Sequence, residues 1–590
     1  MQVKGKIGTK AIYIFSLLTM IGAMVIFLNS FYWPYQDISN RKIAVGIIVG
    51  VCIVVIPIVV CKNTFLSSCV RNVMEKCMYA GKKIRSNRKK ILFGSLVIIL
   101  GCFVAILVTG LLARFLFQTE FNLKLFYMIF ALEMICFVMI TNWKHAKQNT
   151  ERLFLLIALI IGAFSISVTP NRVGVSWDDE VHYAKTLELS NVLNGIMYVA
   201  DDKNIEEYAT NIYAHQGYDR ETSKEYQEDL QELYKQKEFR MHDFSNYGVW
   251  SVAYVPAAIG IIVARGLELS YVNVFNAGCI VNLICYSLLI YYAIKRIKHG
   301  KMLVALIGLL PTTIFMAASY SYDWWVTGFT ILGFSYFFAE MQEDSPLRTK
   351  NLIIAVGAIA IGCLPKAIYF PILFPLLFIP RKKFCSKKQR MGYYLCVVGA
   401  GVLLVASFLL PMLIGGAGAG DVRGGSDVNS TEQILYIIQN PFEYARTLFV
   451  FLKEYISISS VGPMLQRFAY VGNGTFYGVV YAMIWVVAFL DRGDIGEKHF
   501  LIRGTSLVGC AVALVLSTTA LYISFTAVGA NTVAGMQGRY LIPFMLPTLY
   551  AVGQGGVQHK FDKNAFVCVP MLIMAITFIY NMFQMCVRIY

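Results

Sequence analysis

A short acidic stretch near residue 180 contains the residue types that acid–base catalysis requires. Asp178, Asp179 and Glu180 stand in a row, and His182 follows two positions later. Adjacent carboxylates repel one another, and partial burial raises the pKa of at least one of them. A carboxylate tuned in this way can take a proton from a hydroxyl group. These four residues are therefore the candidate catalytic residues, with either Asp178 or Asp179 as the base.

The same stretch also fits an ordinary solvated loop, in which acidic residues are common. His182 follows the two aspartates by three and four residues, so on a helical turn it would share their face and could position one of them. Asp, Glu and His can also hold a divalent cation. Without a second cluster of such residues we predict no metal site, and the need for a cofactor such as a divalent cation stays open.

Three further polar stretches lie beside apolar runs. Asp323 lies in SYSYDWW at a helix end, where an ionisable side chain is costly unless it faces a cavity. Lys366 lies in LPKAIYFP between two apolar runs and could hold a phosphate group. The stretch MQGRYLIP carries Gln537, Arg539 and Tyr540, and arginine suits bidentate phosphate contacts. Each stretch also fits a simple interfacial anchor, but together they are candidates for substrate binding.

The composition indicates how these residues are held. The chain has 590 residues, of which 57% are hydrophobic and 15% charged, whereas soluble domains carry about 25% charged residues. Long apolar runs recur from end to end, and a run of about 20 residues crosses a bilayer. We therefore predict an all-α polytopic membrane protein, embedded in the lipid bilayer of the cell membrane.

The net charge of +17 fits the excess of Lys and Arg in cytoplasmic loops and does not indicate nucleic-acid binding. The basic segments KRIKHGK (295–301) and RKKFCSKKQR (381–390) each lie between two apolar runs. With these segments inside, about 15 membrane spans are expected. They are 11–29, 43–61, 91–113, 125–142, 153–169, 272–294, 302–318, 324–340, 352–365, 367–380, 391–413, 476–490, 504–526, 541–556 and 566–587.

Two segments need a different placement. Residues 170–248 hold 16 of the 35 acidic residues and eight basic ones, and we expect them to form an extracytoplasmic loop. Residues 249–265 are apolar, but if they crossed the membrane, the segment 295–301 would lie outside. We therefore expect them to lie on the outer face as an interfacial or re-entrant helix. The mixed region 430–470 is expected to be amphipathic and external.

The four polar stretches resemble a family of bacterial multi-pass membrane proteins that is catalogued as a domain of unknown function. That family carries the elements Asp-Glu-x-x-His, Ser-x-Ser-x-Asp, Pro-Lys-x-x-Tyr and Gln-Gly-Arg-Tyr-x-x-Pro. The matching segments of this chain are 178–182, 319–323, 365–369 and 537–543. One departure is Asp179, where the family usually has Glu. The resemblance covers the core 151–590, and residues 1–150 are expected to be additional N-terminal membrane helices.

The family in turn resembles the GT-C glycosyltransferases, in which the first external loop holds a catalytic Asp and lies against interfacial helices. The resemblance implies a GT-C-like helical bundle that moves a sugar from a polyprenyl-phosphate-linked donor to an extracytoplasmic acceptor, a glycan or protein of the cell envelope. In this scheme Asp178 or Asp179 is the base, Lys366 and Arg539 hold the phosphate, and Asp323 positions the acceptor or a metal.

Three other functions fit the same pattern. One is a non-catalytic scaffold in an envelope assembly complex, which would tolerate the loss of every motif residue. A lipid-linked glycan polymerase or ligase would use the same donors on the same face of the membrane. A transporter or flippase would carry ionisable groups near the middle of the membrane and repeated halves. The recognisable charged motifs instead gather on one predicted face, which favours chemistry at the surface over transport.

Overall fold

The computed structural model describes residues 88–171, 173–193, 225, 228–232, 249–415, 427–491, 500–553 and 561–589. The predicted spans 11–29 and 43–61 and most of the acidic loop 170–248 lie outside the described residues. Within these ranges all regular elements are helical, and one isolated bridge joins Arg467 and Asn473. The chain is therefore helical wherever its fold is described, as the sequence predicts.

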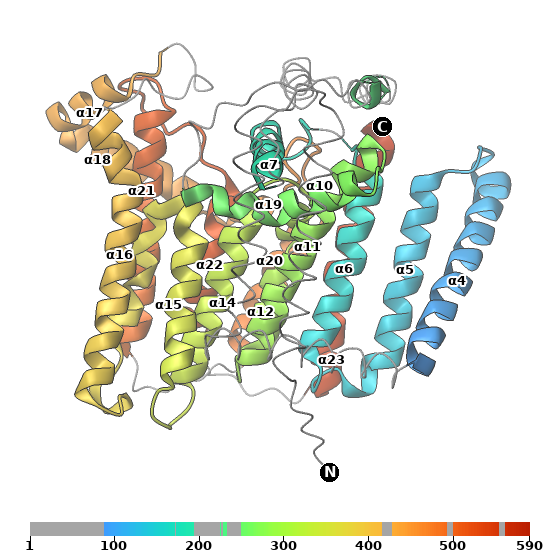
Figure 1. Cartoon of the computed structure of the whole chain (residues 1–590), viewed down its shortest axis with the longest axis horizontal. Coiled ribbons are helices and arrows are strands. Elements are labelled where there is room, and N and C mark those ends of the chain that lie inside the picture. The colour runs from blue at the N-terminus through green and yellow to red at the C-terminus, as the bar shows by residue number, and fades with distance from the viewer. Residues whose placement is uncertain are drawn as a thin grey trace, which may run out of the picture.

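The long helices stand side by side and form one bundle (Figure 1). Eight helical stretches are long and apolar enough to cross a membrane, which makes this a multi-pass membrane protein. The total of about 15 spans stays a prediction. The eight stretches contain the helices α4 (Arg88–Leu111), α5 (Leu123–Asn142), α6 (Thr150–Val168), α11 (Tyr271–Arg296), α15 (Thr349–Cys363), α16 (Lys387–Gly415), α21 (Phe500–Ser524) and α23 (Lys563–Ile589). A ninth long helix, α14 (Asp323–Met341), is not among the eight.

Short helices complete the bundle. Some fill its interior, some lie at the end drawn uppermost in Figure 1, here called the upper end, and η2 and η5 lie at the opposite, lower end. They are η1 (Leu112–Phe117), η2 (Trp143–His145), α7 (Asp179–Leu193), η3 (Val249–Tyr254), α10 (Val255–Gly266), α12 (Lys301–Gly308), α13 (Pro311–Ala317), η4 (Leu364–Phe378), η5 (Arg381–Lys383), α17 (Ser430–Gln439), α18 (Pro441–Tyr455), α19 (Ile458–Met464), α20 (Tyr477–Leu490), η8 (Gly538–Leu541) and α22 (Ile542–Val552).

Helix α10 lies across the upper end of the bundle instead of running along it (Figure 1). Its 12 residues reach only about 18 Å, too short to cross a bilayer core. Ile259 and Val263 are exposed on one face, while Ala257 and Ile261 are buried on the other. Gly260 allows a close approach to α11, since a Cβ atom there would lie 2.6 Å from a backbone oxygen. The expected interfacial placement of 249–265 agrees with this arrangement.

The chain reverses direction between α15 and η4. Lys366 has non-helical backbone angles (φ −133°, ψ 62°) near the start of η4. The end of α15 lies beside the start of α14, because Trp325 Nε1 donates to the carbonyl of Ile361 at 2.9 Å. After η4, Lys383 Nζ donates to the carbonyl of Glu340 at the other end of α14, at 3.0 Å. Residues 352–380 therefore form an antiparallel pair that reverses at Lys366, as predicted.

One predicted span is broken in two. Residues 302–318 form α12 and α13, which meet where Pro311 begins the second helix. Proline lacks the N–H that a continuing helix would need, and it is readily accommodated at a first turn. All seven residues of α13 are buried. The broken segment therefore fills the centre of the bundle, and it brings Ser319 and the following residues to the upper end.

Candidate functional site

The loop that leads into α7 is anchored in the core. Val173, Val175 and Trp177 alternate along it, and each is at most 2% exposed. The Trp177 ring meets the Phe315 ring edge-on, with centroids 6.4 Å apart. Of the acidic residues that follow, Asp179 and Glu180 are buried, with Asp179 only 3% exposed. The alternative of an ordinary solvated loop is therefore excluded.

Asp179 uses its carboxylate to fold this loop. Its Oδ1 accepts the backbone N–H of Gly174 at 2.8 Å, and its Oδ2 accepts those of Val175 and Ser176 at 3.2 and 2.8 Å. Burial and the charge of Glu180 raise the pKa of Asp179 to about 8, and the three backbone donors oppose that rise. Both oxygens are thus directed at the protein's own backbone.

Asp178 points in a different direction from its neighbour. Its φ of +53° lies in the left-handed region, which Asp tolerates better than most residues. Its Oδ2 accepts a hydrogen bond from Arg539 Nη2 at 2.7 Å. The Asp178 side chain is 28% exposed, while that of Arg539 is only 3% exposed. Of the two adjacent aspartates, Asp178 is the one that a substrate can reach.

Four charged side chains from separate segments meet at this point and are here called the quartet: Asp178, Asp323, Lys366 and Arg539. Asp323, the first residue of α14, lies with its Oδ2 3.1 Å from Arg539 Nε. Its Oδ1 accepts a hydrogen bond from Lys366 Nζ at 2.5 Å. Two carboxylates and two cations give a formal charge of zero. The sequence stretches predicted to act together are thus in contact.

Aromatic rings surround the two cations. Lys366 Nζ lies 3.8 Å from the centroid of the Tyr540 ring and within 6 Å of those of Tyr322 and Tyr369. The Arg539 guanidinium lies 5.0 Å from the Trp177 ring and 5.4 Å from the Tyr540 ring. Ring faces attract cations at these distances, more strongly where water is excluded. The rings hold both cations in place while leaving their N–H donors free for other bonds.

Arg539 retains hydrogen-bonding capacity. Among the described residues its buried Nη1 has no hydrogen-bond partner. A buried guanidinium N–H without a partner is costly, so a ligand with an acceptor oxygen would be favoured there. The Oε1 atom of Gln537 is likewise buried without a partner in the described part of the chain. The backbone carbonyl of Gln537 accepts a hydrogen bond from the Tyr455 hydroxyl at 2.6 Å.

His182 lies close to the quartet but does not bond to either aspartate among the contacts seen here. Its Nδ1 is 2.9 Å from the Tyr254 hydroxyl, and its ring packs edge-on against Tyr322. Burial lowers the pKa of His182 to about 3, and the nearby charge of Arg539 acts in the same direction. The histidine is therefore neutral near pH 7. It connects α7 to η3, which differs from the role expected for it.

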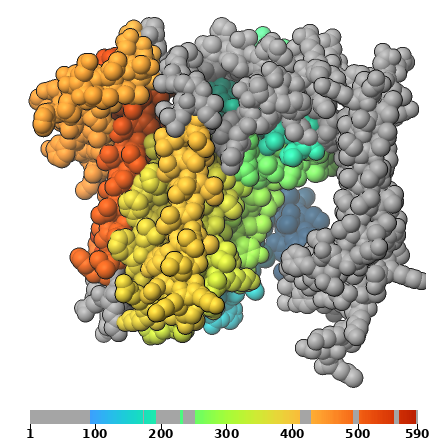
Figure 2. Space-filling view, turned by 60° about the vertical axis from the view of Figure 1, so that its left-hand side comes forward, coloured from blue at the N-terminus to red at the C-terminus, as the bar shows by residue number. Residues whose placement is uncertain are grey.

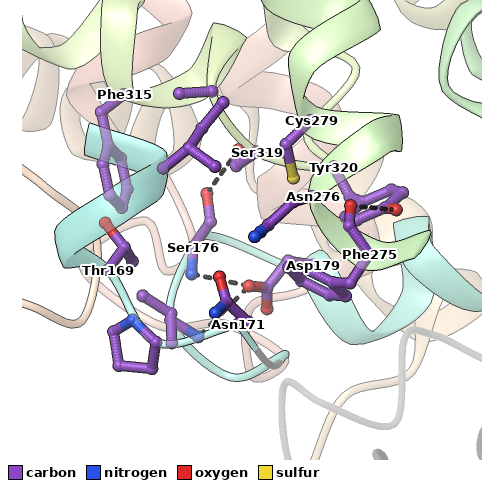
Figure 3. A pocket seen from close by; sticks show the side chains of 14 residues that line it. Thr169, Asn171, Ser176, Asp179, Phe275, Asn276, Cys279, Phe315, Ser319 and Tyr320 are labelled. Carbon is purple, nitrogen blue, oxygen red and sulfur yellow. Dashed lines mark hydrogen bonds between the residues drawn. The ribbon is translucent and has the colours of Figure 1, made fainter. Parts of the chain in front are cut away.

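A small cavity lies beside the loop that precedes α7, and no quartet residue lines it (Figure 3). Its volume is about 30 Å³, and Ser176, Asp179, Asn276 and Ser319 contribute polar groups to its lining. The hydroxyls of Ser176 and Ser319 are 3.1 Å apart. A cavity of this size with several polar groups suits a single water molecule. The cavity is too small for a sugar, so a substrate of that size would have to bind at the quartet.

The described residues contain no group of three or more His, Cys, Asp or Glu side chains placed to hold a metal ion. The carboxylates of the quartet are bound by Lys366 and Arg539 instead. Glu180, also predicted as a site residue, is buried on α7 and lies outside the quartet. Sequence reasoning missed Trp177 and Tyr322 as site residues, and each stands next to a predicted site residue. It named Tyr369 as the tyrosine of the Pro-Lys-x-x-Tyr element but assigned it no role in the site.

Comparisons with known proteins give one match. A family model described as "Predicted membrane protein (DUF2142)" matches residues 159–548, about two thirds of the chain. All four quartet residues fall within the match. No curated protein and no solved structure matches the chain. On the strength of this match, the chain belongs to the DUF2142 family of predicted membrane proteins.

Proposed function

We propose that this protein is an integral membrane glycosyltransferase that moves a sugar from a polyprenyl-phosphate-linked donor to an acceptor of the cell envelope. The observation that carries the proposal is the quartet: two carboxylates and two cations, brought from four distant segments to one end of a helical bundle. A base and a phosphate-binding pair in contact are the parts that such a transfer requires. GT-C-like architecture remains part of this proposal.

The orientation follows from the distribution of basic residues. Arg296 and Lys383, from the basic segments 295–301 and 381–390, contact Glu340 at the end of α14 opposite to Asp323. Because cytoplasmic loops are enriched in Lys and Arg, that end is assigned to the cytoplasm. The quartet then lies on the extracytoplasmic side, where lipid-linked sugars and not nucleotide sugars are the donors.

Asp178 acts as the base in this proposal. It is the more exposed aspartate, and Asp179 is occupied by three backbone N–H groups. The acceptor hydroxyl transfers its proton to Asp178 while its oxygen forms a bond to the anomeric carbon. The bond between that carbon and the phosphate oxygen breaks, and the electron pair leaves with the polyprenyl phosphate. Asp179, Glu180 and His182 hold the loop that carries Asp178.

Lys366 and Arg539 bind the phosphate that leaves. Its charge grows as the glycosidic bond breaks, so cations fixed beside it stabilise the transition state more than the ground state. The unpartnered Nη1 of Arg539 provides a donor for a phosphate oxygen. Tyr540 holds both cations by its ring face, and Gln537 contributes an amide at the edge of the site. Asp323 contacts both Lys366 and Arg539 and so fixes their positions relative to each other.

The decisive experiment separates the two adjacent aspartates. Purified Asp178→Asn and Asp179→Asn proteins are compared in a transfer assay with lipid-linked sugars, and their folding is checked by thermal unfolding. We expect Asp178→Asn to fold normally and lose transfer by a factor of about 10²–10⁴, the usual contribution of a general base. Asp179→Asn should lower the melting temperature, because its amide cannot accept three backbone bonds. Full activity in Asp178→Asn would refute the mechanism.

A further inference from the structure

An apolar groove runs between η4 and α16, on the side of the bundle where α16 forms part of the outer surface (Figure 2). Its volume is about 470 Å³, and every lining residue is hydrophobic or glycine. Phe370, Leu373 and Leu377 line it from η4, and Gly401 and Val405 from α16. Only 17% of the most apolar part of α16 is buried. The groove is therefore accessible from the lipid that surrounds the helices.

Along η4 the groove begins a few residues after Lys366 of the quartet. Phe370 follows Lys366 by four residues on η4, a rise of roughly 6–8 Å. The ammonium of Lys366 is bound at the upper end, where η4 begins. On α16 the lining extends from Val397 to Leu410, which spans about 20 Å along the helix axis. The groove is thus about two thirds of the thickness of a bilayer core in length. It begins about one helical turn from Lys366, the cation that we propose binds phosphate.

We propose that this groove binds the isoprenoid chain of the donor, with the phosphate attached to that chain held by Lys366 and Arg539. This inference rests on the function proposed above, and it specifies where the lipid enters and along which helices it lies. The chain enters sideways from the bilayer between η4 and α16. Because lipid tails are as apolar as the groove itself, shape and the phosphate contact provide the selectivity, and removal from water contributes little.

The short distance between cation and groove favours an isoprenoid phosphate over a glycerophospholipid. In a polyprenyl phosphate the phosphate is bonded to the first carbon of the hydrocarbon chain. In a glycerophospholipid, a glycerol unit and two ester groups separate the phosphate from the chains. The groove contributes no polar side chain that could bind those esters, and buried esters without partners would be unfavourable.

Two glycines of α16 provide a matched pair of variants. A Cβ atom added at Gly401 or at Gly399 would meet no atom within 4 Å, so both positions accept a larger side chain. Gly401 lines the groove and Gly399 does not. Gly401→Trp should therefore fill the groove, while Gly399→Trp places the same ring on the same helix outside it. Equal melting temperatures of the two variants would show that both are folded.

The test uses the full-length protein in nanodiscs with undecaprenyl monophosphate that carries a diazirine on its chain. We expect photolabelling of peptides from η4 and α16, reduced about tenfold in Gly401→Trp and unchanged in Gly399→Trp. Excess unlabelled undecaprenyl phosphate should compete, and phosphatidylglycerol should not. Equal labelling of the two variants, labelling of other helices, or equal competition by phosphatidylglycerol would overturn the proposal.

This experiment requires no sugar transfer, so it separates the groove from the proposed enzymatic function. Specific labelling of the groove together with no transfer from any lipid-linked sugar would leave the lipid site standing and refute the glycosyltransferase. Conversely, a donor with a chain of two isoprene units does not need the lower groove. If the protein is a transferase, Gly401→Trp should slow transfer from the long-chain donor about tenfold and leave the short-chain donor unaffected. If Gly401→Trp slowed transfer from both donors equally, the proposed lipid groove would be refuted, while the proposed transferase activity would stand.

Discussion

Helix α14 has a buried carboxylate at each end, and the two ends differ in how those carboxylates are bound. At the lower end Glu340 is bound by the side chains of Arg296 and Asn351, and by Arg348 through both its backbone N–H at 2.9 Å and its Nε at 3.2 Å. Lys383 donates to two backbone carbonyls there. At the upper end Asp323 is bound by the side chains of Lys366 and Arg539.

The difference distinguishes a structural cluster from a site. The contacts of Glu340 fasten the connections between α11, α14 and α15, and one of them comes from a backbone N–H. The quartet joins side chains alone and includes Asp178, whose side chain is 28% exposed, and an apolar groove begins four residues along η4 from Lys366. Ion pairs of the same chemistry thus serve stability at one end and, in our proposal, catalysis at the other. Substitutions at matched positions of the two ends test this distinction.

The largest effect is expected from removing the carboxylates. Glu340→Ala removes the buried partner of Arg296 and leaves Glu343 as its remaining carboxylate, so the free energy of unfolding should fall by about 1–3 kcal/mol. Asp323→Asn should destabilise the upper end for the same reason, but undecaprenyl phosphate should restore stability by binding the released cations. SDS titration of the protein in mixed micelles, with and without this lipid, measures both. If undecaprenyl phosphate stabilised both variants equally, or stabilised neither, the proposed difference between the lower cluster and the quartet would be refuted.

The next largest effect is expected from replacing arginine by lysine at each end. Arg539→Lys keeps the charge but cannot contact Asp178 and Asp323 together, so kcat/KM for transfer should fall about 100-fold, equivalent to about 2.7 kcal/mol. Arg296→Lys at the lower end should change kcat/KM less than about threefold. Transfer kinetics of the two purified variants provide the comparison. A large loss in Arg296→Lys would mean that the lower cluster also acts in catalysis.

A smaller, pH-dependent effect is expected at His182. Its folded-state pKa of about 3 lies below the unfolded value of 6.5, so the unfolded chain binds an extra proton between these values. The corresponding stability is present above pH 6.5 and is lost as the pH falls. At pH 4.5 the loss is at most about 2.7 kcal/mol.

Unfolding measured from pH 7 to pH 4.5 tests this expectation. The His182→Gln protein should show a correspondingly weaker dependence on pH. A His299→Gln variant, altered near the lower end, should keep the acid sensitivity of the wild type. If His182→Gln follows the wild-type curve, the histidine is not the group responsible.

The smallest effect is expected from the rings that face the arginines. Tyr540→Leu removes the ring beside Arg539 and Lys366, and the loss of about 1 kcal/mol should weaken binding of undecaprenyl phosphate about fivefold. Tyr336, whose ring lies 5.5 Å from the Arg296 guanidinium, is the matched residue at the lower end. Binding titrations should show no change for Tyr336→Leu. Equal weakening by both substitutions would indicate a general loss of packing.

Much of this arrangement could be predicted from the sequence. Long apolar runs located the membrane helices. Residues 249–265 were placed on the surface of the bundle because a membrane crossing there would have put the basic segment 295–301 outside. The polar stretches around residues 178, 323, 366 and 539 were recognised as belonging together, because each pairs an ionisable residue with the end of an apolar run. Such residues are stable there only when they face partners or a cavity.

Other features depend on geometry that the sequence does not reveal. Asp178 and Asp179 are adjacent and identical in type, and only the left-handed backbone at Asp178 directs their carboxylates apart. The lower cluster was not predicted, because Glu340 in AEMQED resembles an ordinary loop boundary. The role of Trp177 depends on Arg539, which is 362 positions away in the chain. Contacts of this range are set by tertiary packing and not by local pattern.

The separation of the quartet along the chain also has a consequence for biogenesis. Asp178 and Arg539, which bond in the finished protein, are 361 residues apart, so a ribosome at 5–20 residues per second needs roughly 20–70 s between them. Throughout that interval the nascent chain carries a carboxylate whose guanidinium has not yet been synthesised. Synthesis of η8, which carries Arg539, therefore completes the charge balance of the quartet.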